Sequence, residues 1–195
     1  MATPRVIKTD FPFVVFSIEA DRDYLLARHL SFTGAGFHSR AGFLGQQACE
    51  KYMKALTVQS QGEYLQTHQL LPLADACAKI DPYFADEKTR NTLRNFDYFE
   101  QVGRYGAAAN FDPLAVQNDE ITTAGVMIWK QEYLQDLDAF VFKTRSSFDY
   151  KKVNYSDSLA AVLAHNKKDI LAGNWSGKPP LYVILTKDNH YFKRA

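Results

Sequence analysis

The sequence has few of the features that mark several common classes of protein. Its two cysteines, Cys49 and Cys77, are too few for a disulfide scaffold and too far apart for a paired-cysteine zinc motif, so we expect buried thiols in a reducing cytoplasm. A formal net charge of +1 gives no overall field that would attract nucleic acid or a membrane surface. No stretch reaches the roughly 18 apolar residues of a membrane span, and Asp10 and Pro12 interrupt any export signal. These absences predict a cytoplasmic protein with no membrane partner.

The familiar catalytic motifs are also missing. The sequence contains no glycine-rich phosphate loop, no HExxH zinc motif and no nucleophile elbow. No glutamate has a histidine three positions later, which argues against a carboxylate-bridged di-metal bundle. We therefore expect neither a metal ion nor a cofactor.

What the sequence does contain is helical periodicity. Its 195 residues, 46% of them hydrophobic, fit one folded domain. Apolar residues recur at helical spacing over about residues 22–33, 37–60, 68–80, 86–102 and 119–143. Asp21 and Thr67 fit the N-cap positions of the first and third of these segments. Residues 107–118 are typical of a loop.

The C-terminal part is less regular. Ser156 fits the cap of a helix over about residues 157–171, and glycines and prolines follow it. The apolar run at residues 181–185 fits either a strand or a helix, and we favour a helix because the chain offers no convincing strand partner. The predicted fold class is all-α, an up-and-down antiparallel helical bundle with an additional C-terminal helical element. We expect a lead-in at 1–19, the bundle at 20–146 and an extension packed on it at 147–195.

The most distinctive stretch is FLGQQACEKYMKAL at residues 43–56, followed by THQL at 67–70 and RYG at 104–106. It resembles the HEPN domain (higher eukaryotes and prokaryotes nucleotide-binding), whose second helix typically reads F-H-x-Q-Q-A-x-E-K-x-x-K-A-L, followed by T-H-x-L and then R-Y-P. Order and spacing both fit, over about residues 20–145. Leu44, Gly45 and Gly106 depart from the pattern.

The resemblance implies an all-α bundle that commonly dimerises and whose relatives bind nucleotides or RNA. Many relatives are encoded beside a small nucleotidyltransferase as a toxin–antitoxin pair. Active members resemble one another in an arginine followed, after four to six residues, by a histidine, which together act as a metal-independent ribonuclease. Here Arg94 begins such a motif, but Phe99, Glu100 and Gln101 stand where the histidine belongs. We therefore expect a non-catalytic protein that binds a nucleotide, RNA or a partner protein, with a homodimer and a nucleotidyltransferase as the expected partners.

Two alternatives stay open. Arg22 and His29 have the spacing of the ribonuclease motif, and residues seven apart share a helix face, but they lie on the first helix rather than at the family's position. That alternative is a ribonuclease of the toxin class. The other is an adaptor bundle with an apolar interaction face, in which the polar motif only specifies folding.

The motif supplies two sets of candidate residues. The first set carries groups that can contact a nucleotide or phosphate: Lys51, His68, Arg94 and Arg104. The second set is expected to have a structural role, through buried amides and an exposed acid–base pair four residues apart: Gln46, Gln47, Glu50 and Lys54. The aromatic group Phe96, Tyr98, Phe99 and Tyr105 fits the core better than base stacking.

Overall fold

The computed structural model of the chain describes residues 4–10, 13–33, 37–105, 123–149 and 181–192. Its helices are α1 (Phe13–Thr33), α2 (His38–Gln61), α3 (Leu70–Cys77), α4 (Glu87–Tyr105), α6 (Thr123–Ser146) and α8 (Leu181–Thr186). A short 3-10 helix, η2 (Pro82–Ala85), and two strands, β1 (Arg5–Lys8) and β2 (Glu63–Gln66), complete the described elements. The predicted all-α class with a C-terminal helical element is confirmed.

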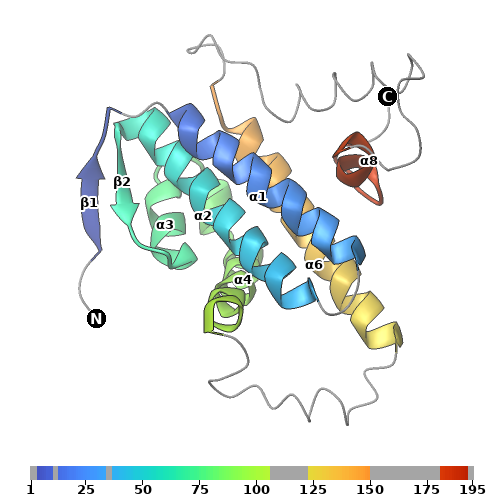
Figure 1. Cartoon of the computed structure of the whole chain (residues 1–195). Coiled ribbons are helices and arrows are strands. Elements are labelled where there is room, and N and C mark those ends of the chain that lie inside the picture. The colour runs from blue at the N-terminus through green and yellow to red at the C-terminus, as the bar shows by residue number, and fades with distance from the viewer. Residues whose placement is uncertain (1–3, 11–12, 34–36, 106–122, 150–180, 193–195) are drawn as a thin grey trace, which may run out of the picture.

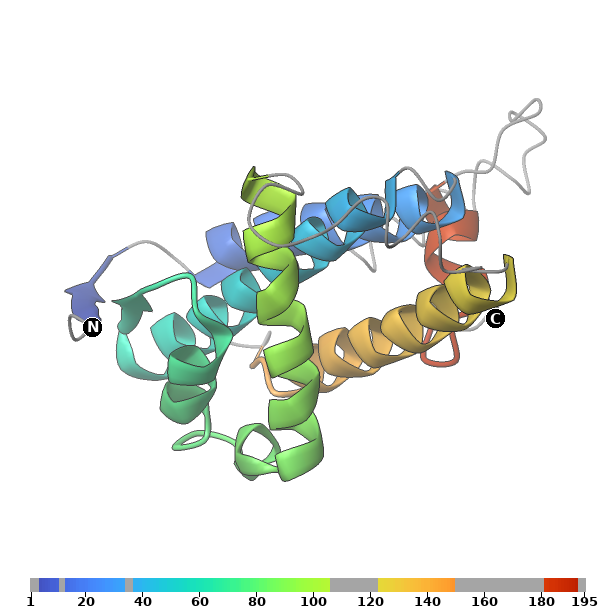
Figure 2. The same ribbon diagram turned by 90° about the horizontal axis from the view of Figure 1, so that it is seen from below.

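Two long antiparallel helices organise the fold. Helices α1 and α2 lie side by side, and α6 runs along them on the other side of the core (Figure 1). Helix α4 crosses this layer steeply and packs, with α3, on α2 (Figure 2). The strand pair lies at one end of the bundle and α8 packs against α1 at the other (Figure 1).

Helix α2 is the centre of the core. The helical spacing of its small and apolar residues predicts a helix over 37–60, and this prediction is confirmed. Ala48, Tyr52, Ala55 and Leu56 are completely buried. They meet buried residues of α1 and α6 such as Tyr24, Ala27, Leu137, Phe140 and Val141. Burial of this apolar surface is the main stabilising contribution to the bundle.

The start of the first helix was predicted wrongly. Helix α1 begins at Phe13, so part of the expected lead-in is helical, and Asp21 lies inside the helix instead of capping it. Asp21 is buried and accepts hydrogen bonds from Tyr52, 31 residues away at 2.5 Å, and from Arg145, 124 residues away. These distant partners hold the carboxylate inside the bundle, and the residues around Asp21 in the sequence do not predict them.

The region before α3 also differs from the prediction. No strand was expected, yet β1 and β2 pair antiparallel, with Arg5 opposite Gln66 and Lys8 opposite Glu63. Gly62 turns the chain out of α2 with φ of 69°, a left-handed conformation that suits glycine. The N-cap of α3 is Gln69, not Thr67, and the first N–H of the helix, that of Leu70, donates to Asp97 of α4 at 3.0 Å.

The remaining helices agree with the sequence. Helix α4 continues three residues beyond the expected end at Val102: of the two glycines that could end it, Gly103 lies inside the helix and Gly106 follows its last residue, Tyr105. The apolar run at 181–185 is helical, which confirms the helix over the strand. The predicted loop at 107–118, the start of the helix predicted from Asp119 and the predicted helix at 157–171 lie outside the described residues.

Candidate functional site

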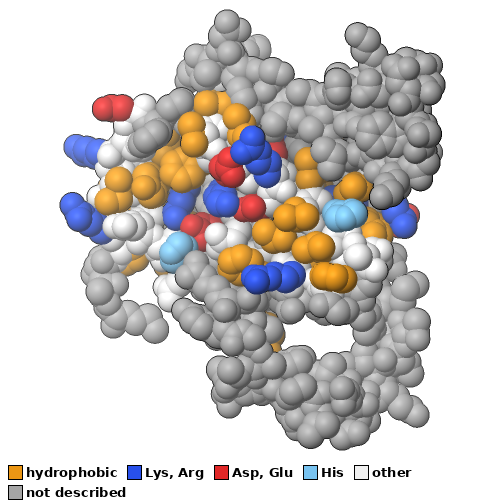
Figure 3. Space-filling model, in the orientation of Figure 1, with side chains coloured by type: hydrophobic (Ala, Val, Ile, Leu, Met, Phe, Trp, Pro, Cys, Tyr) orange, Lys and Arg blue, Asp and Glu red, His pale blue; other side chains and the backbone are white. Residues whose placement is uncertain are grey.

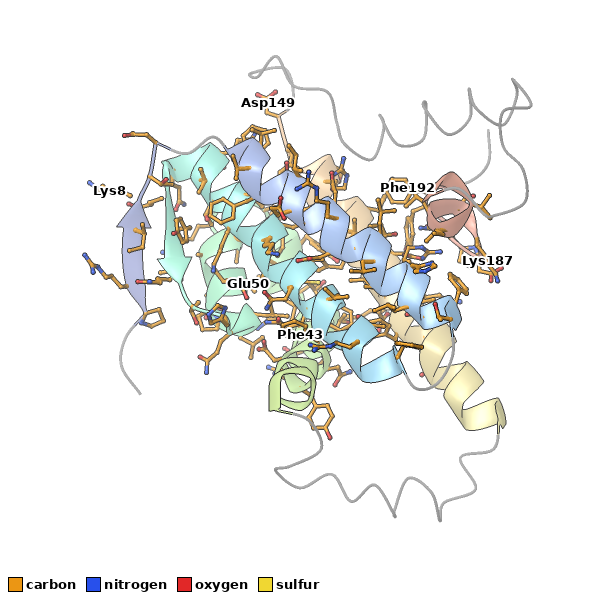
Figure 4. The ribbon with its side chains drawn as sticks, viewed as in Figure 1. Lys8, Phe43, Glu50, Asp149, Lys187 and Phe192 are labelled. Atoms are coloured by element: carbon orange, nitrogen blue, oxygen red, sulfur yellow. The ribbon has the colours of Figure 1, made fainter. Side chains whose placement is uncertain are left out.

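The polar residues of the motif gather into one cluster on α2. We call Gln46, Gln47, Glu50, Lys54 and His68 the α2 polar cluster. Glu50 is at its centre, on the side of α2 that faces β2 and α3 (Figure 4). Its carboxylate accepts a hydrogen bond from Lys54 Nζ at 2.7 Å and lies 3.1 Å from Nδ1 of His68. Both members of the Glu50–Lys54 pair are buried, so the expectation of an exposed pair is wrong.

The two glutamines tie α2 to the turn before α3. Gln46 Nε2 donates to the backbone carbonyl of His68 at 2.7 Å, and Gln47 Nε2 donates to Gln46 Oε1 at 2.7 Å. Gln47 also reaches Glu50 at 3.3 Å. Each buried polar group therefore has a partner, which removes the desolvation penalty of an unsatisfied donor or acceptor. The cluster fixes the turn at 67–69 against α2.

His68 is the part of the cluster that reaches solvent. Its side chain is 55% exposed, whereas the Glu50 carboxylate beneath it is buried. With Nδ1–H donating to Glu50, Nε2 of the neutral ring is a hydrogen-bond acceptor, and in the protonated ring it is a donor. An imidazole oriented in this way can bind a polar ligand or exchange a proton with it.

The other candidate contacts for phosphate are engaged elsewhere. Lys51 forms an ion pair with Asp23 of α1, whose pKa is raised by burial and lowered in part by this lysine. Arg94 is exposed and pairs with Glu87, 3.1 Å away on its own helix. Arg104 lies in the last turn of α4, and its side chain is outside the described part. The structure thus brings His68 to the structural residues of the motif, not to Lys51 or Arg94.

The pair with ribonuclease-like spacing lies on the outer side of α1. Arg22 is exposed and bonds to Glu19, 2.5 Å away. His29 is exposed as well. Neither side chain belongs to the α2 polar cluster.

A second polar cluster, which no local sequence pattern indicated, joins α1 and α6 to the residues around α8. We call Tyr24, Arg28, Asp138 and Asn189 the C-terminal network. Arg28 is completely buried and forms an ion pair with Asp138 of α6, and it donates to the carbonyls of Ile184, at 3.0 Å, and Lys187. Tyr24 donates to Asp138 at 2.6 Å and accepts from Asn189 at 2.9 Å. This network attaches α8 and the turn after it to the bundle.

Burial dominates the acid–base chemistry of the network. It raises the pKa of Asp138, against the opposing effect of Arg28 and the hydrogen bond from Tyr24. It also raises the pKa of Tyr24 well above 10.0, and the neighbouring Asp138 carboxylate adds to this. These groups are enclosed, so their role is to hold the fold together.

A third feature is an apolar surface on α1 and α2. Leu26 of α1 and Phe37, just before α2, are exposed, and Leu30, Phe43 and Leu44 of the same two helices are partly buried. Hydrophobic side chains gather over these helices beside a group of charged ones (Figure 3). We call these five residues the outer apolar face. Exposed apolar side chains on neighbouring helices are a feature of many interaction sites.

The described residues contain neither a group of metal-binding side chains nor a membrane-spanning helix. In the described ranges, no group of three or more His, Cys, Asp or Glu side chains could hold a metal ion. None of the helices that the structure describes is both long and apolar enough to cross a membrane.

Comparison with known proteins identifies the family. No curated protein and no solved structure matches the chain. The family model of the HEPN domain matches residues 18–125, which is more than half of the 195 residues. The match includes α2 with its polar cluster, the turn at 67–70 and all of α4. Since the family model covers more than half of the chain, including the motif helix, the chain belongs to the HEPN domain family.

Proposed function

We propose that this HEPN protein is a non-catalytic binding protein, and that its ligand is a nucleotide or an RNA end held at the surface around His68. The observation that carries the proposal is the contact between the exposed His68 ring and the buried Glu50 carboxylate. A fixed imidazole presents a polar nitrogen without the entropic cost of ordering the side chain on binding.

Arg104 enters this proposal as a second contact only through its place in the RYG motif. Arg94 and Lys51 already have carboxylate partners, so a phosphate would have to replace Glu87 or Asp23. Exchange is easier at the exposed Arg94 pair, because exposed ion pairs contribute only about 0–1 kcal/mol. Among the described residues we therefore rank His68 first, Arg94 next and Lys51 last as ligand contacts.

The absence of catalysis follows from the motif. Positions 99–101 carry Phe, Glu and Gln where a ribonuclease of this family would have its histidine. Arg22 and His29 could replace that pair only on the outer side of α1, where Arg22 is held by Glu19. We expect single-stranded RNA to stay intact over hours with the purified protein. Cleavage that His29→Ala abolishes would establish the toxin-class alternative.

The test of binding is isothermal calorimetry with ATP, AMP and a short single-stranded RNA. We expect heat with at least one ligand, a loss of affinity in His68→Ala and in Arg104→Ala, and no loss in His29→Ala. His29 is a matched control because it is also an exposed histidine but lies on α1. Equal affinity of the wild-type protein and His68→Ala would refute the site.

A second candidate function is that of a dimeric adaptor, and the outer apolar face favours it. Two copies, or this chain and a nucleotidyltransferase, would bury Leu26 and Phe37 against each other, and a stable interface of this kind covers more than about 1,000 Å² in total. The test is light scattering after gel filtration. We expect a dimer that Leu26→Asp dissociates and that Val6→Asp, at an exposed apolar residue of β1, leaves intact. A monomeric wild-type protein would remove the homodimer.

A further inference from the structure

Two aromatic rings are stacked on the surface near the C-terminus. Phe142 of α6 and Tyr191, which follows α8, have ring centroids 5.0 Å apart and planes inclined by 29°. Their exposed fractions are 39% and 41%. Phe192 meets Phe142 edge-on at 6.1 Å and supports the pair from the side. We call Phe142 and Tyr191 the aromatic platform.

The platform is held in place by the C-terminal network. Asn189 is buried, and its Oδ1 accepts from the backbone N–H groups of Tyr191, at 3.0 Å, and Phe192, at 3.2 Å. The same side chain donates to Tyr24 of α1 at 2.9 Å. Arg28 holds the two carbonyls at the end of α8, just before this turn. The position of Tyr191 is therefore set by buried groups, so a ligand need not order it.

Two lysines and a histidine lie close to the platform residues along the chain. Lys143 follows Phe142 on α6, and Lys187 and His190 precede Tyr191, all three of them exposed. Lys187 lies with its ammonium 4.4 Å from the centroid of the Phe32 ring, a contact that leaves its charge in place. Two acids face this region: Asp138 is buried and bound to Arg28, and Asp188 is exposed in the turn. Since Arg28 neutralises Asp138, two lysines stand against the single acid Asp188 in this region.

We propose that the aromatic platform binds an unpaired base of a single-stranded nucleic acid, and that the exposed Lys143 and His190, the sequence neighbours of Phe142 and Tyr191, contact the backbone phosphates. Exposed aromatic faces combined with cations are the chemistry by which proteins bind single strands, because every base has a π-face and every linkage a negative charge. The pair is outside the family match at 18–125 and does not depend on the His68 site.

The experiment is fluorescence anisotropy with the full chain and fluorescein-labelled 12-mers of uridine, adenosine and thymidine, beside a hairpin duplex. We expect the single strands to bind more tightly than the duplex, whose bases are already stacked, and the affinity to fall as salt rises. Tyr191→Leu keeps an apolar side chain but removes the ring, so it should weaken binding by about tenfold, whereas Tyr191→Phe should leave binding unchanged.

The controls separate this proposal from its alternatives. Tyr98→Leu removes an exposed tyrosine of α4 and should have no effect. Equal thermal midpoints of the variants would show that each is folded. Tyr191→Leu that binds like wild type, equal affinity for duplex and single strand, or no binding of any oligonucleotide would overturn the platform. Loss of RNA binding in His68→Ala but not in Tyr191→Leu would overturn the platform and support the His68 site. Loss of RNA binding in Tyr191→Leu but not in His68→Ala would support the platform and refute the His68 site.

Discussion

The α2 polar cluster and the C-terminal network both bring an acid and a base into the interior, but they are built from different parts of the chain. In the cluster, Glu50 meets Lys54 four residues away and His68 eighteen residues away. In the network, Arg28 meets Asp138, 110 residues away. The cluster opens to solvent at His68, whereas Arg28 and Asp138 are enclosed. The α2 polar cluster can therefore present a side chain to a ligand, whereas the C-terminal network holds helices that are distant in the sequence against each other.

Arg28→Ala is expected to give the largest effect. It leaves Asp138 buried without its cation and frees the carbonyls at the end of α8, so we expect a loss of about 3 to 5 kcal/mol in the free energy of unfolding. Urea unfolding followed by circular dichroism measures it. Arg22→Ala, at an exposed ion pair, is the control and should change stability by less than about 1 kcal/mol. Similar stabilities of the two variants would show that the network is not a structural anchor.

Glu50→Ala tests the other side of the comparison. The substitution leaves Lys54 buried without a carboxylate, but His68, which loses its hydrogen bond to Glu50, is exposed to water. We therefore expect the free energy of unfolding to fall by about 2 to 3 kcal/mol, less than in Arg28→Ala. The double variant Glu50→Ala/Lys54→Met should recover part of this loss, because no charge then remains buried there. Glu87→Ala, at the exposed pair with Arg94, serves as the control. A larger effect for Glu50→Ala than for Arg28→Ala would reverse the ranking.

Gly45→Ala examines the packing of the motif helix on α6. A Cβ at this position would lie 1.8 Å from Oη of Tyr133, which itself donates to the carbonyl of Ala41 at 3.0 Å. Although alanine favours helices over glycine, we expect overpacking to destabilise by about 1 to 3 kcal/mol. In a Tyr133→Phe background the same substitution should cost less. Thermal unfolding measures both, with Ser60→Ala, exposed on α2, as the control. A stabilised Gly45→Ala would contradict the close contact.

The smallest expected effect is on the pH dependence of stability. Burial raises the pKa of Tyr83 to about 12 from 10.0, so the folded protein keeps this phenol neutral over a range where the unfolded chain ionises. Its contribution to stability is complete below pH 10 and is lost as the pH rises from 10 to 12. Urea midpoints across this range should fall less steeply in Tyr83→Phe than in the wild type. Parallel curves would show that Tyr83 ionises normally in the folded state.

Much of the fold was visible in the sequence because its signals are local. The 3.6-residue spacing predicted α2 to within a residue at each end, and Gly106 was one of the two glycines expected to end α4. The spacing of Glu50 and Lys54 predicted their pairing, but not their burial, which depends on β2 and the turn before α3 covering that side of α2. The strands were missed because each has only four residues and is defined by its partner.

The candidate sites show the same limit. His68 was named from a motif, yet its contact with Glu50 exists only because Gln46 and Gln47 hold the turn at 67–69 on α2. Asp21 reads as a helix cap locally, but Tyr52 and Arg145 decide its role. The sequence separation of Phe142 and Tyr191 does not predict that their rings stack.

The helical class, the HEPN motif and the lack of the ribonuclease histidine at positions 99–101 can all be read from the sequence. Each depends only on the identity and spacing of residues that are close together in the chain. Which charges are buried, which residues attach α8 to the bundle and which aromatic rings face solvent depend instead on the tertiary structure. The clearest case is Arg28 and Asp138, which are 110 residues apart and meet in a low-dielectric interior, where a buried charge is stable only when it is paired.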